Sequence, residues 1–331
     1  MRGEKAVAIF LSGVYNEIML AVIVIIAATV VLFISAVGFY ANSLLFFREK
    51  VSPVDPEPDK CFDPKTRPVA LTAPGHKKAV ILVHGFPSSP SAYRKAGDLY
   101  FKAGYDVFIP LLPGFGTSPD DFVKTNFSQW FDYLCRFYEE KRAAYPHLFV
   151  NGTSMGGALT LKLAERYSNT EKAPDAVVTA AAPVFLNKIR LGVMRQPGMY
   201  IIKLIAPFVS KIGAGLNNGK PQGGVNGDEE WRGYTGLYPK QTYSLYMNLK
   251  QIERDLKKIT VPILMMHSKQ DRTVPFANLF YIAARLGTPE VTCRIIDSGT
   301  FDYTHHCLFM YDSLRERLVN ETVAFFEEVS E

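Results

Sequence analysis

The distribution of apolar residues divides the chain into an N-terminal apolar segment and a longer region of short alternating patterns. Between Ile18 and Ala41 no residue is charged, and the apolar run is interrupted only by one threonine, one serine and one glycine. A helix of this length spans a hydrocarbon core of about 30 Å. A cleaved signal peptide has a shorter apolar stretch, and a buried helix of a soluble domain ordinarily has a polar face. We therefore predict a single transmembrane anchor over residues 18–47, after an N-terminal tail at 1–17.

The basic residues that flank this anchor bear on its orientation. Because cytoplasmic flanks carry an excess of Lys and Arg, the bias towards the C-terminal side favours a cytoplasmic catalytic domain. Long domains translocate largely regardless of charge, so both orientations stay open. The basic residues before the anchor are Arg2 and Lys5, and those after it are Arg48, Lys50, Lys60, Lys65 and Arg67.

After the anchor, the pattern changes first to a proline-rich segment and then to a regular alternation of elements. Residues 48–76 are rich in proline and charge, which predicts a linker. From residue 77 onwards, short apolar runs typical of buried parallel strands alternate with amphipathic helical segments. This alternation predicts a doubly wound α/β domain over 77–331 with a mostly parallel sheet. The predicted strands are 79–83, 106–110, 148–151, 176–180, 261–266 and 291–296, and the main predicted helices are 91–102, 126–145, 276–286 and 308–329.

A segment between the fourth and fifth predicted strands departs from this alternation. Over residues 185–250, prolines interrupt an apolar stretch, and a glycine-rich stretch follows at 213–236. An insertion of this length at the carboxyl edge of a sheet is typical of a cap or lid over a binding site, although a disordered surface excursion has the same length signal. We expect a cap whose apolar residues line an acyl channel or touch the bilayer.

The strongest chemical signal is the pentapeptide Gly152-Thr153-Ser154-Met155-Gly156, which follows an apolar strand and precedes a helical segment. A strand that turns sharply into a helix holds Ser154 in a strained backbone conformation and exposes its hydroxyl at the sheet edge. The glycines are needed because side chains there would collide with the neighbouring strand and helix. The helix N-terminus beneath Ser154 favours developing negative charge. Ser154 is therefore the candidate nucleophile.

A serine nucleophile needs a base and an acid, and the chain supplies both in the order acid then histidine. Asp271 follows the fifth predicted strand at the carboxyl edge of the sheet, where ligands bind in open α/β folds. His305 and His306 follow the sixth strand, and only one of them can be the base. We favour His306, with His305 as its neighbour. A metal site at the histidine pair lacks supporting Cys or carboxylate spacing.

Acyl transfer also requires two donors directed at the oxyanion, usually backbone N–H groups. We expect one from Met155, directly after the nucleophile, and one from Phe86, in the loop that ends the strand at 79–83. In the same loop, His84 is interpreted as a structural residue that hydrogen-bonds the loop.

Composition excludes several other classes of function. The net charge of +5 is mild, and the basic residues form no stripe with interleaved aromatics, so nucleic-acid binding is not expected. The four cysteines show neither a C-x-x-C pair nor metal-ligand spacing, and a disulfide scaffold is not expected. No cofactor or metal is predicted. The expected partners are a small acyl-ester substrate and the lipid bilayer.

These motifs together resemble the α/β-hydrolase superfamily, and in particular its bacterial carboxylesterases and monoacylglycerol lipases. The resemblance covers about residues 77–329. It rests on His84-Gly85-Phe86, the 112–119 loop, the Gly152–Ala158 turn, and Asp271 with His306. Phe115 stands where that group often has a histidine, and the glycine-rich insertion differs from its compact cap.

The sequence therefore predicts a membrane-anchored serine hydrolase that cleaves carboxylic esters through an acyl-enzyme on Ser154. The apolar cap and the tether favour medium or long acyl chains, as in monoacylglycerols or lysolipids. Two alternatives remain. The same residues can pass the acyl group to an alcohol, as an acyltransferase, or the fold can serve as a non-catalytic binding protein.

Overall fold

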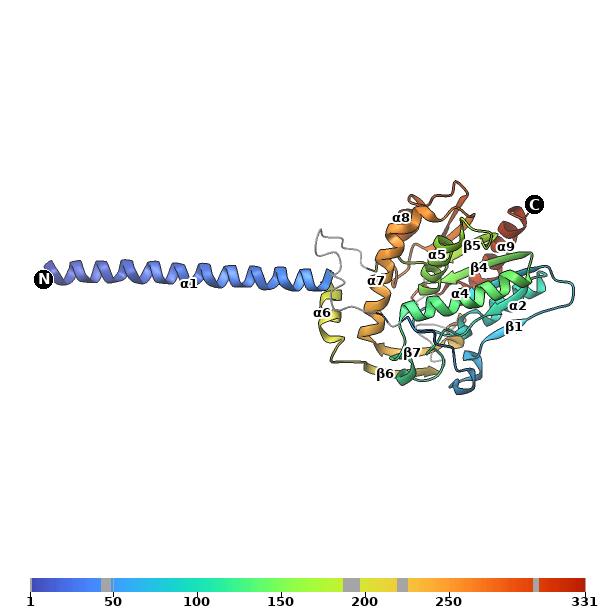
Figure 1. Ribbon diagram of the computed structural model, residues 1–331, viewed down its shortest axis with the longest axis horizontal. Helices are drawn as coiled ribbons and strands as arrows, with labels where there is room; N and C mark the ends of the chain where they lie inside the picture. The colour runs from blue at the N-terminus through green and yellow to red at the C-terminus, as the bar shows by residue number, and fades with distance from the viewer. Residues whose placement is uncertain are drawn as a thin grey trace.

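The computed structural model describes residues 2–42, 49, 51–186, 197–218, 226–299 and 304–330. A single long helix, α1 (Arg2–Asn42), projects from an α/β domain as an isolated rod (Figure 1). Its stretch Gly13–Tyr40 is long and apolar enough to cross a membrane by length and composition, and it is exposed along its length. The helix begins at Arg2, so the tail expected at 1–17 is part of the same helix.

The domain is built on a seven-stranded sheet in the order β1-β3-β2-β4-β5-β8-β9. Neighbouring strands are parallel throughout, except that the edge strand β1 runs antiparallel to β3. The six predicted strands all form, and they occupy the parallel part of the sheet. The strands are β1 (Val69–Leu71), β2 (Lys78–Val83), β3 (Asp106–Ile109), β4 (His147–Thr153), β5 (Ala176–Ala180), β8 (Ile263–Ser268) and β9 (Val291–Ile296).

Helices cover both faces of this sheet and bury alternate residues of its strands. In β2, Ile81 and Val83 pack into one hydrophobic core, while Val80 and Leu82 pack into the other. Strands that are buried on both faces consist of nearly continuous apolar residues, and this pattern is why they could be predicted from the sequence. The first core is closed by α4 (Phe127–Ala144), α5 (Met155–Tyr167), α7 (Pro239–Asp255) and α8 (Asn278–Ala283), and the second by α2 (Arg94–Lys102) and α9 (Asp312–Glu328); a short helix α3 (Pro119–Phe122) lies in the loop after β3.

The segment predicted as a linker is partly a component of the folded domain. Strand β1 lies before the expected domain start at residue 77, and the Thr66 hydroxyl donates to the Gly116 carbonyl at 3.0 Å. Arg94 Nε donates to the Lys65 carbonyl at 2.8 Å. The prolines suggested an extended linker, but proline is equally suited to the first turn of a helix. Here prolines begin the short 3₁₀ turns at Pro58–Lys60 and Pro64–Thr66.

The inserted segment contains more regular structure than expected. It comprises helix α6 (Pro197–Ile205), the antiparallel pair β6 (Ile212–Asn218) and β7 (Arg232–Leu237), and the long helix α7. The described parts of the glycine-rich stretch form this hairpin. Glycine is required at Gly236, because its φ is +92° and a Cβ there would lie 2.5 Å from the Ile212 carbonyl oxygen. Residues 187–196 and 219–225 of the predicted cap lie outside the described residues.

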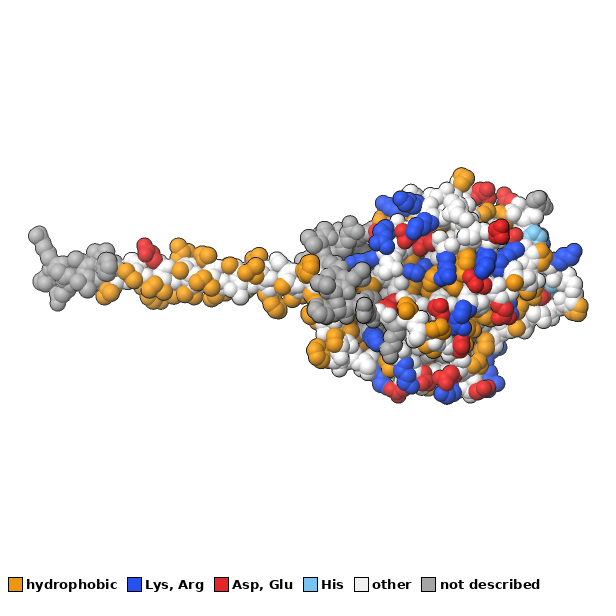
Figure 2. All heavy atoms as spheres, viewed as in Figure 1, with side chains coloured by type: hydrophobic (Ala, Val, Ile, Leu, Met, Phe, Trp, Pro, Cys, Tyr) orange, Lys and Arg blue, Asp and Glu red, His pale blue; other side chains and the backbone are white. Residues whose placement is uncertain are grey.

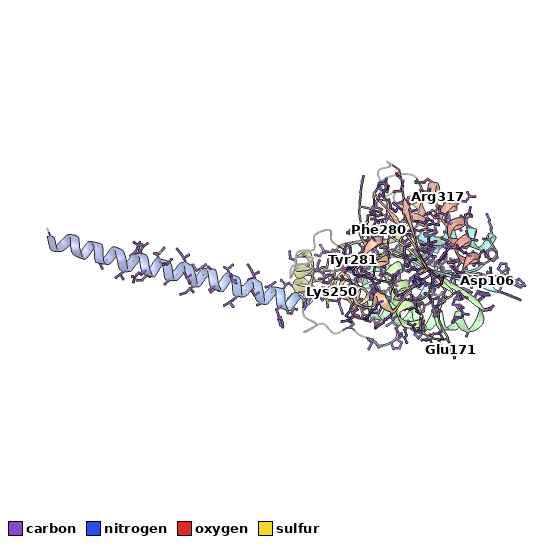
Figure 3. All side chains as sticks on the ribbon, turned by 90° about the horizontal axis from the view of Figure 1, so that it is seen from above. Asp106, Glu171, Lys250, Phe280, Tyr281 and Arg317 are labelled. Carbon is purple, nitrogen blue, oxygen red and sulfur yellow. The ribbon has the colours of Figure 1, made fainter. Side chains whose placement is uncertain are left out.

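The sheet is oriented with its carboxyl edge towards α1. Asp106, the first residue of β3, lies at the end of the domain away from α1. Lys250 of α7, in contrast, lies near the end of α1 that meets the domain, which we call its inner end (Figure 3). Because β2, β3, β4, β5, β8 and β9 run parallel, their carboxyl ends all face the end of the domain from which α1 projects.

Candidate active site

Ser154 sits at the turn between β4 and α5 in a conformation that L-residues seldom adopt. Its φ is +59° and its ψ is −123°. A Cβ on Gly152 would lie 2.2 Å from the Gly156 carbonyl oxygen, and a Cβ on Gly156 would lie 1.9 Å from the Val83 carbonyl oxygen. The strained serine and the requirement for both glycines are confirmed. Such strain persists only where the surrounding structure enforces it, which is typical of a functional turn.

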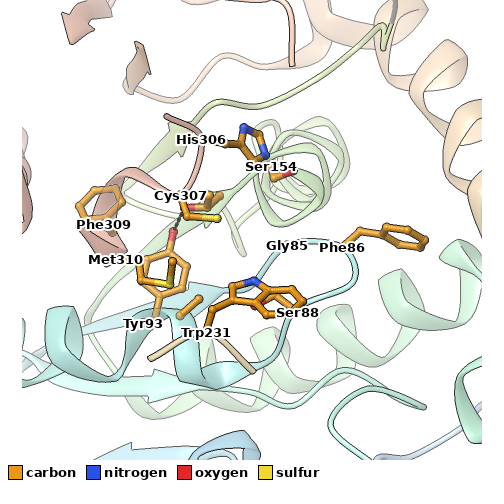
Figure 4. A pocket seen from close by; sticks show the side chains of 12 residues that line it. Gly85, Phe86, Ser88, Tyr93, Ser154, Trp231, His306, Cys307, Phe309 and Met310 are labelled. Atoms are coloured by element: carbon orange, nitrogen blue, oxygen red, sulfur yellow. Dashed lines mark hydrogen bonds between the residues drawn. The ribbon is translucent and has the colours of Figure 1, made fainter. Parts of the chain in front are cut away.

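Asp271 and His306 are brought together from distant parts of the chain. His306 Nδ1 donates to Asp271 Oδ2 at 2.8 Å. Within the described part of the chain, His306 Nε2 is buried and has no hydrogen-bond partner. Figure 4 shows the His306 ring directly beside Ser154. The structure therefore places all three predicted residues at the carboxyl edge of the sheet, with the His306 ring next to the serine.

The carboxylate of Asp271 is held by more donors than the sequence indicated. Its Oδ1 accepts the N–H groups of Thr273 and Val274 at 2.7 and 2.9 Å. Its Oδ2 lies 3.2 Å from His267 Nε2, in addition to His306. Burial alone would raise the pKa of Asp271, but attraction to His306 and the hydrogen bonds to the carboxylate outweigh it and lower the pKa well below its usual value. Asp271 is therefore ionised throughout the neutral range.

Sequence reasoning missed His267, although its position offered a signal. It lies near the end of β8, four residues before Asp271, and its ring is buried. Its Nε2 also lies 3.2 Å from the Val274 carbonyl, so this nitrogen carries the proton and donates.

His305 faces a different environment from His306. Its Nδ1 lies 2.7 Å from the Ser298 hydroxyl, which also contacts Ser268. Its backbone has a φ of +56°. This left-handed residue turns the chain so that consecutive histidine rings point in different directions. Of the two adjacent histidines, His306 is the one that contacts the carboxylate of Asp271.

The loop that carries Phe86 packs directly against the nucleophile. A Cβ on Gly85 would lie 3.1 Å from Ser154 Cβ and 3.1 Å from the Thr153 carbonyl oxygen. Met155 is the first residue of α5, where backbone N–H groups have no partner within the helix. Strand β7 supports the loop from the other side, because the Tyr234 N–H donates to the Pro87 carbonyl at 3.0 Å.

His84 is a buried neutral imidazole that ties this loop to the next one. Its Nε2 accepts the Leu112 N–H at 3.3 Å, so its Nδ1 carries the proton and donates to the Gly85 carbonyl at 3.2 Å. The Phe115 ring packs edge-on against the His84 ring, with the two ring centres 5.0 Å apart. Burial lowers the pKa of His84 to about 4. The structural interpretation of His84 is confirmed.

This buried histidine gives folding stability a defined dependence on pH. The folded pKa of about 4 lies below an unfolded value of about 6.5, so acid protonates the unfolded chain first. We expect His84 to cost the native state about 1.4 kcal/mol per pH unit between those values, or about 3 kcal/mol in all. Replacing His84 with Gln should weaken this acid destabilisation. Urea unfolding of both chains at about pH 7 and about pH 5 measures it; equal pH dependence would contradict the assignment.

A cavity that is partly open to solvent lies between Ser154, His306 and the Gly85–Phe86 loop (Figure 4). Thr153 of the serine turn also lines it, and the remaining lining comes from residues that the sequence did not single out: Ser88, Ala92, Tyr93, Trp231, Cys307, Phe309 and Met310. Among the described residues, no three His, Cys, Asp or Glu side chains are grouped as metal ligands. The cavity is thus a largely apolar site beside a serine, a histidine and backbone donors.

Trp231 comes from the inserted segment and is held in place by the segment before β1. The Asp63 carboxylate accepts from Arg232 Nε at 2.7 Å, and the Ser91 hydroxyl accepts the Arg232 N–H at 3.0 Å. Arg232 is almost buried. The predicted linker and the predicted cap therefore meet at the wall of the cavity.

The sheet order, the serine turn and the acid–histidine pair define the chain as an α/β hydrolase. Residues 74–305 match the sequence profile of the family described as serine aminopeptidase, S33, and the chain belongs to that family. The matched region includes Ser154 and Asp271 and ends just before His306.

The chain is similar in sequence and in fold to proteins described as lipases and lipolytic enzymes. The chain is 30% identical over 213 residues to the thermostable monoacylglycerol lipase of Bacillus sp. (strain H-257), covering 64% of this chain and 77% of that protein. A metagenome-derived lipolytic enzyme has a TM-score of 0.65 at 20% identity, covering 80% of this chain and 98% of that one. A soluble variant of the Saccharomyces cerevisiae monoglyceride lipase, solved with a substrate analogue, has a TM-score of 0.61 at 17% identity, covering 86% and 98%. The protein is therefore a lipase- or esterase-like α/β hydrolase.

Proposed function

We propose that the protein is a membrane-anchored serine hydrolase that cleaves carboxylic esters through a covalent acyl-enzyme. The observation that carries this proposal is the arrangement of Asp271, His306 and Ser154. His306 bonds to Asp271 through Nδ1, its buried Nε2 has no partner among the described residues, and its ring lies beside the strained serine. This is the geometry that activates a hydroxyl for attack on a carbonyl carbon.

In the first half of the reaction, His306 Nε2 takes the proton of Ser154 Oγ as the oxygen attacks the ester carbonyl. Asp271 fixes the Nδ1–H tautomer and stabilises the imidazolium that forms. The tetrahedral intermediate collapses, the C–O bond to the alcohol breaks, and His306 returns the proton to the leaving alcohol. In the second half, water attacks the acyl-enzyme with His306 again acting as base, and releases the carboxylic acid and free Ser154.

The oxyanion of each intermediate is assigned to the backbone N–H groups of Met155 and Phe86. The close approach of Gly85 to Ser154 supports this assignment, because it brings the Phe86 loop within reach of the reacting carbon. Preorganised donors of this kind are each worth about 10²–10³ in rate.

The proposed substrates are acyl esters of the monoacylglycerol or lysolipid type. Support comes from the apolar lining of the cavity and from the similarity to a monoacylglycerol lipase. A substrate of this kind partitions into bilayers, and α1 is proposed to be a transmembrane anchor that holds the catalytic domain at the surface where such substrates are found. The carboxyl edge of the sheet, and with it Ser154, faces the anchored end. The proposed location of the domain is the cytoplasmic side.

Hydrolysis of p-nitrophenyl esters of increasing chain length tests this function. We expect the full-length protein in detergent to hydrolyse these esters, with kcat/KM rising from acetyl to medium and long acyl chains as more apolar surface is buried. Product analysis with an added alcohol separates hydrolysis from acyl transfer. Preference for acetyl esters would contradict the lipid substrate, and no hydrolysis of any ester would contradict the enzyme assignment.

A further inference from the structure

Helix α6 in the inserted segment has one packed face and one exposed apolar face. Met199 and Ile202 pack on the cluster formed by Tyr243, Tyr246 and Met247 of α7. On the outside, Ile201, Leu204 and, just after the helix, Phe208 are 64%, 42% and 87% exposed. We call these three residues the α6 patch. Large side chains exposed together at this level mark a surface that meets a partner.

The position of α6 indicates which partner this is. It contacts the inner end of α1 and lies across the axis of that helix, so that it is parallel to the surface of a bilayer spanned by α1 (Figure 1). The Lys203 ammonium lies 4.0 Å from the centre of the Tyr40 ring, donates to the Tyr40 carbonyl, and lies 5.5 Å from the Tyr243 ring. Tyr40 is also the last residue of the membrane-crossing stretch. The junction of α1 and α6 is therefore at the height of the membrane surface.

The chain that leaves α1 keeps the domain close to this position. Only six residues separate Asn42 from Glu49, and an extended chain of that length reaches about 25 Å at most. The Glu49 carboxylate accepts hydrogen bonds from the Ser128 and Ser244 hydroxyls and, at 3.2 Å, from Asn248 Nδ2. These contacts fasten the start of the linker to α4 and α7, and α7 packs against α6.

Exposed apolar side chains follow one another along α1 from Leu11 to Phe39 and occur again on the domain beside the inner end of this helix, where α6 lies (Figure 2). We infer that the α6 patch is a second membrane contact, an interfacial helix that inserts Ile201, Leu204 and Phe208 among the lipids of the bilayer that α1 spans. This inference rests on the proposed membrane anchoring of α1. A helix with an apolar outer face, lying in the plane of the membrane, binds in proportion to the apolar area that it buries.

This contact has a consequence for access to the site. Helix α6 is followed by the hairpin of β6 and β7, and Trp231, the residue directly before β7, forms part of the cavity wall. When the α6 patch is inserted among the lipids, the inserted segment and the carboxyl edge of the sheet behind it lie directly over the bilayer. An ester dissolved in that bilayer then reaches Ser154 without crossing bulk water.

Tryptophan quenching by brominated phospholipid measures the depth of the α6 patch. The two native tryptophans, Trp130 and Trp231, are buried and give a constant background. The full-length protein with Phe208→Trp is reconstituted in nanodiscs with and without brominated acyl chains. The matched control is Ala103→Trp, because Ala103 is exposed just after α2, which lies at the end of the domain away from α1 (Figure 1).

We expect brominated lipid to lower the added emission of Phe208→Trp by about half and to leave that of Ala103→Trp unchanged within about a tenth, because bromine quenches over short distances and only inserted residues meet it. Equal emission changes at the two positions would overturn the inference. Resistance of α1 to alkaline extraction, measured on the same samples, reports the anchor separately. Extraction of the whole chain would contradict the proposed anchoring, whereas a retained chain without quenching contradicts only the role of α6.

A rate comparison tests the consequence for access. We expect Ile201→Ser with Phe208→Ser to lower the hydrolysis of a long-chain ester in the same nanodiscs by at least about fivefold and to leave hydrolysis of a water-soluble butyryl ester within about twofold, since neither residue lines the cavity at Ser154. Equal losses on both esters would indicate damage to the domain and would overturn this role.

Discussion

Ser154→Ala is expected to abolish ester hydrolysis and labelling by a fluorophosphonate probe, with a loss in kcat of about 10⁴–10⁶-fold. The alanine leaves His306, Asp271 and the backbone donors in place, so that only binding and oxyanion stabilisation remain. Small side chains suit this strained position better than large ones, and the folded domain should be retained. The measurement is active-site labelling of the full-length protein, together with the rate of p-nitrophenyl ester hydrolysis.

The serine that flanks the other end of α5 provides the matched control for this prediction. Ser168 follows α5 at the end opposite Ser154, and its side chain lies outside the cavity. We expect Ser168→Ala to keep wild-type labelling and rate within about twofold, as is usual for a substitution away from the site. Labelling of Ser154→Ala at the wild-type level would show that another residue is the nucleophile and would contradict the proposed mechanism.

The sheet and the serine turn were predictable because their physical requirements act over a few residues. A strand buried on both faces must be almost continuously apolar, as β2 is from Ala79 to Val83. A sharp strand-to-helix turn must have glycines where the backbones touch, as at Gly152 and Gly156. These signals are local, so a single sequence contains all of the information that they need.

The inserted segment was less predictable because its order depends on contacts between distant residues. The hairpin of β6 and β7 has many glycines, and glycine is equally consistent with a mobile loop and with a tight turn. Its position is set by Tyr234, which reaches the Pro87 carbonyl, and by Arg232, which reaches Asp63. Neither partner lies near it in the sequence. The same reason accounts for the linker, whose buried Thr66 bonds to Gly116.

The candidate site shows the same division between local and distant information. Ser154 and Asp271 each follow a recognisable strand, and chain order alone proposes their roles. The role of His267 depends on its ring reaching the Asp271 carboxylate from the preceding strand, and strand alternation by itself indicates only that the residue is buried. Trp231 enters the cavity from a segment that lacked any strand signal.

The choice between the two adjacent histidines is tested by the same substitution at each position. We expect His306→Asn to lower kcat by about 10⁴-fold or more, because Asn cannot accept the proton of Ser154. His305→Asn should keep kcat within about tenfold, since Asn tolerates the left-handed backbone at φ +56° and can still bond to Ser298. The measurement is kcat for a p-nitrophenyl ester, with thermal unfolding of both variants to show that each is folded.

The unfolding data make this comparison decisive. His305 belongs to a buried hydrogen-bonded group with Ser298 and Ser268, so its substitution acts mainly on stability, by about 1–2 kcal/mol. The Asp271 carboxylate keeps its bonds to the Thr273 and Val274 N–H groups when His306 is replaced, and His306 Nε2 has no partner within the described residues, so the loss of His306 acts mainly on the rate. A folded His305→Asn variant with the activity loss of His306→Asn would show that His305 is the base, and the pairing of His306 with Asp271 would then be structural.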